Sequence, residues 1–354
     1  MPRAIREAVD GRAWVQAMLD AEAALARAEA RAGVIPADAA SQIAAACESS
    51  RYDPEQIGEE GRRVANPAEP LVRRLREVSE WAHHGATSQD IVDTAMMLVA
   101  KRARALILEQ ADGVAAACAR LAGDHRATVM AARTLLQQAV PTTFGLKAAG
   151  WLAGVAEARR RLATVELAAQ LGGAAGTLAA LGGNAPEVHR LYAEELGLAE
   201  PALPWHANRV RIAELVGVLG LLAGACGKIA HDVILLAQTE VAEVTVPAGA
   251  STAMAHKRNP ASAVVALAAA RQVAPAIDLA GEHERAAGAW QAEWPAVANA
   301  LAYTGGAAAA ARETLDGLEV DVERMRANMT PVLADYPEAS DVWVDRALEA
   351  YGQA

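Results

Sequence analysis

The polar residues that could do chemistry in this alanine-rich chain gather in three short segments. The most informative is Gly249 to Pro260, where small residues lead to Ser251 and then to Lys257 and Asn259. A hydroxyl that moves a proton, beside an ammonium and an amide that hold a carboxylate, suits proton transfer at the carbon next to that carboxylate. The alternative is an exposed basic helix start, which would place positive charge against the helix dipole.

The second polar segment, His83 to Asp90, carries adjacent hydroxyls at Thr87 and Ser88. Thr87 and Asp90 have the spacing of a capping box, which predicts that a helix starts here. Because the free N–H groups at a helix start stabilise an anion, we expect a carboxylate to dock there. An ordinary helix cap would explain the same residues. His83 and His84 are adjacent and lack metal-ligand spacing, so no metal site is predicted.

The third polar segment, residues 133–143, combines Arg133 and Gln137 with threonines ahead of a predicted helix. The planar guanidinium of arginine binds both oxygens of a carboxylate. Taken alone the segment is a weak indication, because such residues also occur at ordinary helix starts. Together, the three segments predict an anionic small-molecule substrate.

Composition predicts an all-α fold and excludes several partner classes. Of the 354 residues, 53% are apolar and only 4% aromatic, which favours close-packed helices over strands. The net charge of −10, without a basic stripe, argues against nucleic acid and anionic membranes as partners. Three distant cysteines and an N-terminal stretch without the apolar core of a secretory signal predict a cytoplasmic protein.

Periodicity and caps predict the elements that carry these segments. A helix should run from Asp10 to about residue 32, a second from Pro36 to about 47, and at least one more within 51–81. Long helices are expected over 87–124, about 143–170, 208–240 and 258–280, the first roughly 55 Å long at ~1.5 Å per residue. The glycine-rich stretch 167–186 is predicted to be a loop.

These helices predict a bundle whose apolar faces are too extensive for one chain to cover, so we expect helices shared between subunits. The predicted organisation is an N-terminal helical domain over 1–86, a central long-helix bundle over 87–320 that forms the oligomer core, and an abbreviated C-terminal region over 321–354.

Residues 250–260 resemble the signature G-S-S-x-M-P-x-K-x-N-P of the fumarase, aspartase and adenylosuccinate lyase superfamily. Ser251, Lys257 and Asn259 match the signature, whereas alanine replaces its leading glycine and its proline, and Thr252 its second serine. The resemblance covers most of the chain and implies a fumarase/aspartase-like fold with a shortened C-terminal region. It also implies a homotetramer with composite active sites and no metal or organic cofactor.

Further strings resemble the 3-carboxy-cis,cis-muconate cycloisomerase branch of the superfamily. They include HHGATSQDIVDT, LQQAVPTTFGLKAAGW, GGAAGTLAALG, LPWHANR and EHERAAGAWQAEW. Lyases that eliminate fumarate typically carry a histidine where this chain has Leu135, which disfavours adenylosuccinate lyase. A non-catalytic tetrameric helical scaffold remains the alternative from another class, although the retained signature residues argue against it.

The branch resemblance implies interconversion of 3-carboxy-cis,cis-muconate and its lactone, a step of protocatechuate (beta-ketoadipate) catabolism. Proton transfer at the carbon alpha to a carboxylate is implied to use Ser251 and His83 as catalytic residues. The residues implied to bind substrate are Thr87, Ser88, Arg133, Gln137, Lys257, Asn259, Arg285 and His206.

Overall fold

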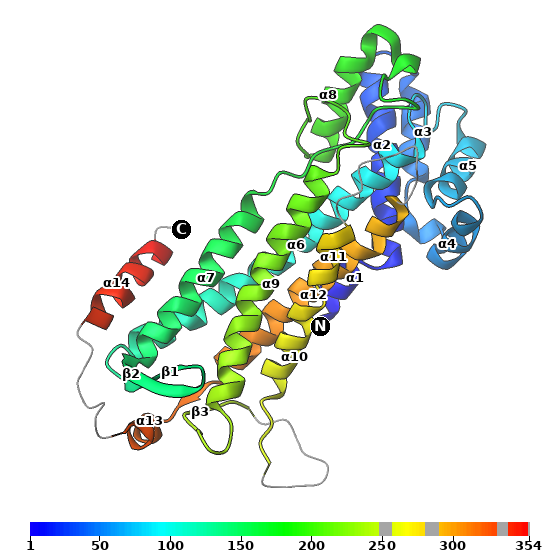
Figure 1. Ribbon diagram of the computed structural model, residues 1–354. Helices are drawn as coiled ribbons and strands as arrows, with labels where there is room; N and C mark the ends of the chain where they lie inside the picture. The colour runs from blue at the N-terminus through cyan, green and yellow to red at the C-terminus, as the bar shows by residue number, and fades with distance from the viewer. Residues whose placement is uncertain (248–256, 280–289, 331–338, 353–354) are drawn as a thin grey trace.

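The computed structural model describes residues 1–247, 257–279, 290–330 and 339–352. Its centre is a bundle of helices running along the long axis of the molecule (Figure 1). They are α6 (Ser88–Asp124), α7 (Phe144–Thr164), α9 (Val210–Leu236), α10 (Ala261–Arg271) and α12 (Glu293–Asp316). α6 packs against α7 and α12, and α9 packs against α7, α10 and α12. The predicted all-α bundle is therefore confirmed.

The long helices begin close to where the sequence predicts, because each start carries a local signal. Thr87 and Asp90 form the expected capping box at α6, and the Thr143 hydroxyl accepts the Leu146 N–H at the start of α7. The helix expected over 258–280 is instead interrupted near residues 272–273, after which α11 (Ala274–Leu279) continues. α12 was not predicted.

Further helices cluster at the end of the bundle where α6 begins (Figure 1). They are α2 (Gly11–Arg31), α3 (Ala37–Ala46), η1 (Ser49–Arg51), α4 (Pro54–Arg63), α5 (Ala68–Val78), η2 (Ala179–Asn184) and α8 (Ala185–Leu196); α1 (Arg3–Ala8) lies against α6 and α12. Asp10 caps α2 as predicted, by accepting the Ala13 N–H. Because α2 packs on both α6 and α8, the apolar core is continuous across residue 86, and the proposed domain boundary stays a prediction.

The opposite end of the bundle carries the strands, which the sequence did not predict. β1 (Val129–Thr134) and β2 (Gln137–Thr143) form an antiparallel hairpin just after α6 ends. Its two turn residues, Leu135 and Leu136, both have positive φ (50° and 64°), a conformation that favours glycine and asparagine. β3 (Val244–Thr245) pairs with β4 (Glu319–Val320), and α13 (Val322–Asn328) and α14 (Ala339–Gly352) complete this end.

Two apolar segments raise the question of a membrane. The loop predicted over 167–186 is confirmed for residues 167–178, whereas η2 occupies Ala179–Asn184 and α8 begins at Ala185. Among the described helices, α9 alone has the length and hydropathy of a membrane span, and half of that stretch is buried in the bundle. A core helix of a soluble bundle has the same composition, so this finding does not indicate a membrane protein.

Candidate active site

The start of α6 presents the hydroxyl pair to a small pocket of about 310 Å³. Thr87, Ser88 and Gln89 line it together with Asn66 and Gln291. Thr87 and Ser88 are partly exposed, at the positively polarised end of a 37-residue helix. The geometry therefore suits a docked carboxylate, as the sequence predicts.

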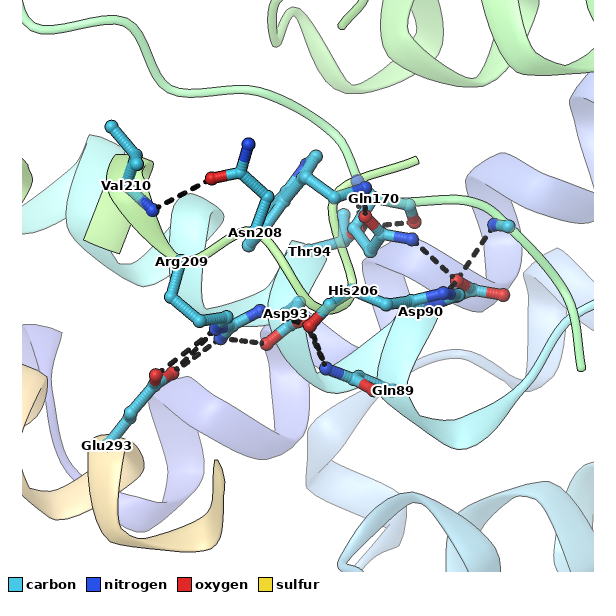
Figure 2. Close-up of polar contacts among 12 residues, drawn as sticks. Gln89, Asp90, Asp93, Thr94, Gln170, His206, Asn208, Arg209, Val210 and Glu293 are labelled. Carbon is cyan, nitrogen blue, oxygen red and sulfur yellow. Dashed lines mark hydrogen bonds and ion pairs between the residues drawn. The ribbon is translucent and has the colours of Figure 1, made fainter. Parts of the chain in front are cut away.

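Asp90 ties this helix start to two other parts of the chain (Figure 2). Its buried carboxylate accepts the Thr87 N–H at 2.9 Å and the N–H groups of Gly172 and Gly173, each at 2.9 Å. It also contacts Nε2 of His206 at 2.5 Å. One side chain thus fixes the helix cap, the course of the glycine-rich loop and the histidine ring.

His206 lies behind the helix start, with a side chain only 6% exposed. The sequence predicts that His206 binds substrate, whereas in the fold its Nε2 is bound to the buried Asp90 carboxylate. Direct substrate contact by His206 stays a prediction, and the geometry favours a supporting role.

A buried ion triad lies next to Asp90 (Figure 2). The guanidinium of Arg209, 1% exposed, binds both oxygens of Asp93 at 2.7 and 2.8 Å and reaches Glu293 at 2.5 Å. Burial lowers the pKa of Arg209, but the two carboxylates raise it by more than burial lowers it, so the net shift of this pKa is upward. This triad was not predicted from the sequence, although Arg209 is the last residue of LPWHANR and Glu293 the second-last residue of EHERAAGAWQAEW.

His83, the predicted catalytic histidine, lies in the turn that precedes α6. Its Nδ1 contacts Oε1 of Glu22 at 2.6 Å, and the next residue, His84, contacts Glu29 at 2.9 Å. Both glutamates come from α2 and are almost completely buried. Burial raises the pKa of Glu29 to about 9, and the neighbouring charge of Glu22 adds to this shift.

Arg133 is bound to a carboxylate of the chain itself. Its guanidinium contacts both oxygens of the buried Glu243, at 2.9 and 2.5 Å, and Asn328 donates to the same carboxylate at 3.0 Å. Gln137 is exposed on β2. The predicted substrate contact of Arg133 would have to compete with Glu243, so the geometry favours a structural role for this arginine.

Arg133 also lines a cavity of about 610 Å³ between the hairpin, α7 and α9. Lys147 and Lys228 line the same cavity around one carboxylate, Asp232. Trp151 Nε1 donates to Asp232 at 2.7 Å. Burial lowers the pKa of Lys147, although Asp232 partly opposes that effect. This end of the molecule therefore has an excess of cations beside the hairpin.

Ser251 and Arg285 lie outside the described residues. Lys257 is exposed and Asn259 half-buried just before α10, whose start lies at the hairpin end of the bundle (Figure 1). Within one chain, residues 133–143 and residues 257–260 therefore lie at the far end of the bundle, separated from Thr87 and Ser88 by about the length of α6. At ~1.5 Å per residue its 37 residues span about 55 Å.

Comparison with known proteins identifies the family. A family model described as "Lyase" matches residues 4–274, which is most of the chain. The chain belongs to this lyase family. Within the family, it is 49% identical over 352 residues to nitrosuccinate lyase of Streptomyces davaonensis, covering 92% of this chain and 74% of that protein. It is 47% identical over 346 residues to 3-carboxy-cis,cis-muconate cycloisomerase of Bradyrhizobium diazoefficiens, covering 92% and 77%.

Solved structures place the lyase fold on nearly the whole chain. The crystal structure of 3-carboxy-cis,cis-muconate lactonizing enzyme from Pseudomonas putida superposes with a TM-score of 0.92 at 34% identity, covering 99% of this chain and 97% of that one. Fumarate lyase from Mesorhizobium sp. gives a TM-score of 0.82 at 35% identity, covering 98% and 86%. The predicted superfamily and its fumarase/aspartase-like fold are thus confirmed.

Proposed function

We propose that this lyase-family chain is a 3-carboxy-cis,cis-muconate cycloisomerase. The observation that carries the proposal is the pocket at the start of α6, where Thr87 and Ser88 offer hydroxyls at the positive end of a long helix. Relatives and solved structures bearing the cycloisomerase or lactonizing name support it over most of the chain. Leu135 supports it as well, because a histidine acid is absent at that position.

In the proposed reaction, a carboxylate oxygen of the muconate attacks the double bond of the same molecule, and a proton reaches the carbon alpha to another carboxylate. Negative charge builds up on that carboxylate as an enolate-like dianion, so fixed cations and N–H donors lower the barrier. Lys257 and Asn259 would hold it, while Ser251 and His83 handle protons. Thr87 and Ser88 would hold a second carboxylate. The proposal requires no metal or organic cofactor.

The proposal includes assembly into a homotetramer with sites composed from several copies. The separation of the three polar segments along α6 supports it, since one copy alone keeps them apart. The hairpin tip supports it too, because Leu135 and Leu136 are 96% and 71% exposed on a turn with unfavourable φ angles. A second copy would cover these side chains. A cytoplasmic protein acting in protocatechuate catabolism completes the proposal.

A second candidate reaction is elimination from nitrosuccinate, because the nitrosuccinate lyase relative is 49% identical. Both reactions need a bound polycarboxylate, with three carboxylates in 3-carboxymuconate and two in nitrosuccinate, and a proton transferred at the carbon beside a carboxylate. They differ in the group that leaves or adds, so the two reactions can be separated by product.

The test is ultraviolet absorbance of 3-carboxy-cis,cis-muconate mixed with the purified protein. We expect the conjugated diene to disappear, and Ser251→Ala to abolish this loss while Ser262→Ala, outside the signature, keeps it. Parallel reactions with nitrosuccinate and adenylosuccinate are followed by nitrite release and fumarate absorbance. Nitrite release without diene loss would establish the second candidate, and no turnover of any substrate would leave the scaffold interpretation.

A further inference from the structure

Two consecutive histidines at the start of the candidate site are each held by a buried glutamate from the same helix. Glu22 and Glu29 lie seven residues apart on α2, two turns along one face. Their side chains are each 1% exposed, whereas His83 is 9% and His84 29% exposed. The chain thus buries two carboxyl groups in contact with two adjacent imidazole rings. Burial of a carboxyl group costs free energy unless the group is hydrogen-bonded or paired.

We propose that Glu22 is a positioning residue that holds the proton of His83 on Nδ1 and leaves Nε2 as the nitrogen that meets substrate. A ring nitrogen bound to a carboxylate fixes both the tautomer and the orientation of a histidine. Among the described residues, Nε2 of His83 has no hydrogen-bond partner. This inference rests on the proposed function, because it assigns His83 a role in the same proton transfer.

The backbone around His83 supports a fixed orientation. His83 has φ of 62°, a left-handed conformation that costs energy in a non-glycine residue and concentrates at functional sites. Two residues later Gly85 has φ of 66°, and a Cβ there would come within 2.8 Å of Leu181. The turn therefore packs closely against Leu181, and the contact with Glu22 sets the direction of the His83 ring.

The charges around His83 come from three helices. Burial lowers its pKa, but Glu22 on α2 raises it through charge and a hydrogen bond, and Asp90 on α6 adds to this. Arg76 on α5 acts in the opposite direction. The net shift is upward, so the ring keeps its proton to higher pH than a free histidine. Such a ring can donate a proton or hold an anionic intermediate at neutral pH.

The neighbouring pair supplies a control within the same helix. Because burial raises the pKa of Glu29 to about 9, its carboxyl carries a proton near neutral pH. Glu29→Gln then replaces one neutral hydrogen-bonding group by another of the same shape. Glu22→Gln makes the same atomic change but removes a charge that acts on His83.

The first measurement does not depend on turnover. We would follow the histidines by NMR with ring-labelled protein, assigning His83 and His84 with His83→Gln and His84→Gln. In the wild type, His83 should titrate above the usual value of ~6.5 with its proton on Nδ1. Glu22→Gln should lower the pKa of His83, and Glu29→Gln should leave it unchanged. A His83 that titrates normally in the wild type overturns the inference even if a variant fails to fold.

The second measurement is the pH profile of kcat/KM for 3-carboxymuconate. Glu22→Gln should reduce kcat/KM by roughly 10²-fold, mainly through kcat, and move the limb assigned to His83 to lower pH. Glu22→Asp should recover part of the rate because it keeps the charge, whereas a packing role would favour the isosteric Gln. Equal losses in Glu22→Gln and Glu29→Gln, or an unchanged profile, overturn the inference. A wild type without turnover refutes the proposed function, and the NMR titration then still decides the Glu22–His83 pair.

Discussion

Replacing Arg209 by methionine should destabilise the fold strongly, because the guanidinium is the shared partner of two buried carboxylates. Asp93 and Glu293 are both essentially inaccessible to solvent, and Arg209 binds them on two sides. Removing one partner of a buried ion pair costs about 3–5 kcal/mol, since the charge left behind is uncompensated. Methionine keeps most of the apolar stem, so the loss measures charge rather than volume.

The expected magnitude is about 4 kcal/mol. The cost should not double with two carboxylates, because a buried carboxylate without its partner takes up a proton instead of staying charged. Gln89 also continues to donate to Asp93 at 3.1 Å. At about 2 °C per kcal/mol for a domain of this size, the unfolding midpoint should fall by roughly 8 °C. The deficit should shrink on acidification from pH 7 to pH 5.

The assay is thermal unfolding followed by circular dichroism at one fixed chain concentration, since any assembly makes the midpoint concentration-dependent. Arg211→Met is the matched control, two residues along the same helix start, where the guanidinium pairs with the exposed Glu166. A surface pair of this kind contributes about 0–1 kcal/mol. If Arg209→Met unfolds within 1 °C of Arg211→Met, the argument from burial is refuted.

Three further predictions address pH, the turn before α6 and assembly. In the unfolded chain Glu29 loses its proton near pH 4.5, whereas in the folded protein it keeps this proton up to about pH 9. The free energy of unfolding of the wild type should therefore fall by up to about 1.4 kcal/mol per pH unit between these two values. Urea titrations should show that the free energy of unfolding of Glu29→Gln rises relative to that of the wild type from pH 5 to pH 8. The same pH dependence in both proteins would contradict the raised pKa of Glu29. Gly85→Ala should cost about 1–3 kcal/mol in the same titrations, because the position needs φ of 66° and Leu181 fills the space of a Cβ. Leu135→Asp should reduce the particle mass measured by light scattering while the helical signal is kept; an unchanged mass would show that the tip is not buried by a second copy.

Elements with local signals could be predicted from the sequence. Asp10 with the apolar period behind it specifies α2, and Thr87 with Asp90 specifies the start of α6. The hairpin could not be predicted, because Leu135 and Leu136 stand where asparagine and glycine usually indicate such a turn, and Pro141 lies in the second strand. In the fold, β1 contacts α13 and β2 contacts α7, neighbours that the local sequence of the hairpin does not indicate.

The candidate site could be predicted only in part, and the roles of its residues stay predictions. Hydroxyls at a helix start reveal Thr87 and Ser88 directly. The partner of His83 lies 61 residues away on α2, and the contact between Arg209 and Glu293 spans 84 residues. Such pairings depend on how the helices pack. In the sequence, these glutamates and arginines cannot be distinguished from ordinary surface residues. For the same reason Arg133 and His206 were predicted to bind substrate, whereas in the fold each of them contacts a carboxylate of the chain itself.

The length of α6 has a consequence for how this protein works in a cell. A folded single copy has Thr87 and Ser88 at one end of the bundle and Lys257 and Asn259 at the other, so neither end alone has all the residues of the proposed site. Specific activity should therefore depend on protein concentration. On dilution, turnover should vanish while the helices persist. Mixing a copy disabled at Ser88 with another disabled at Lys257 should restore a fraction of the rate, because some sites would then draw both intact halves from different copies.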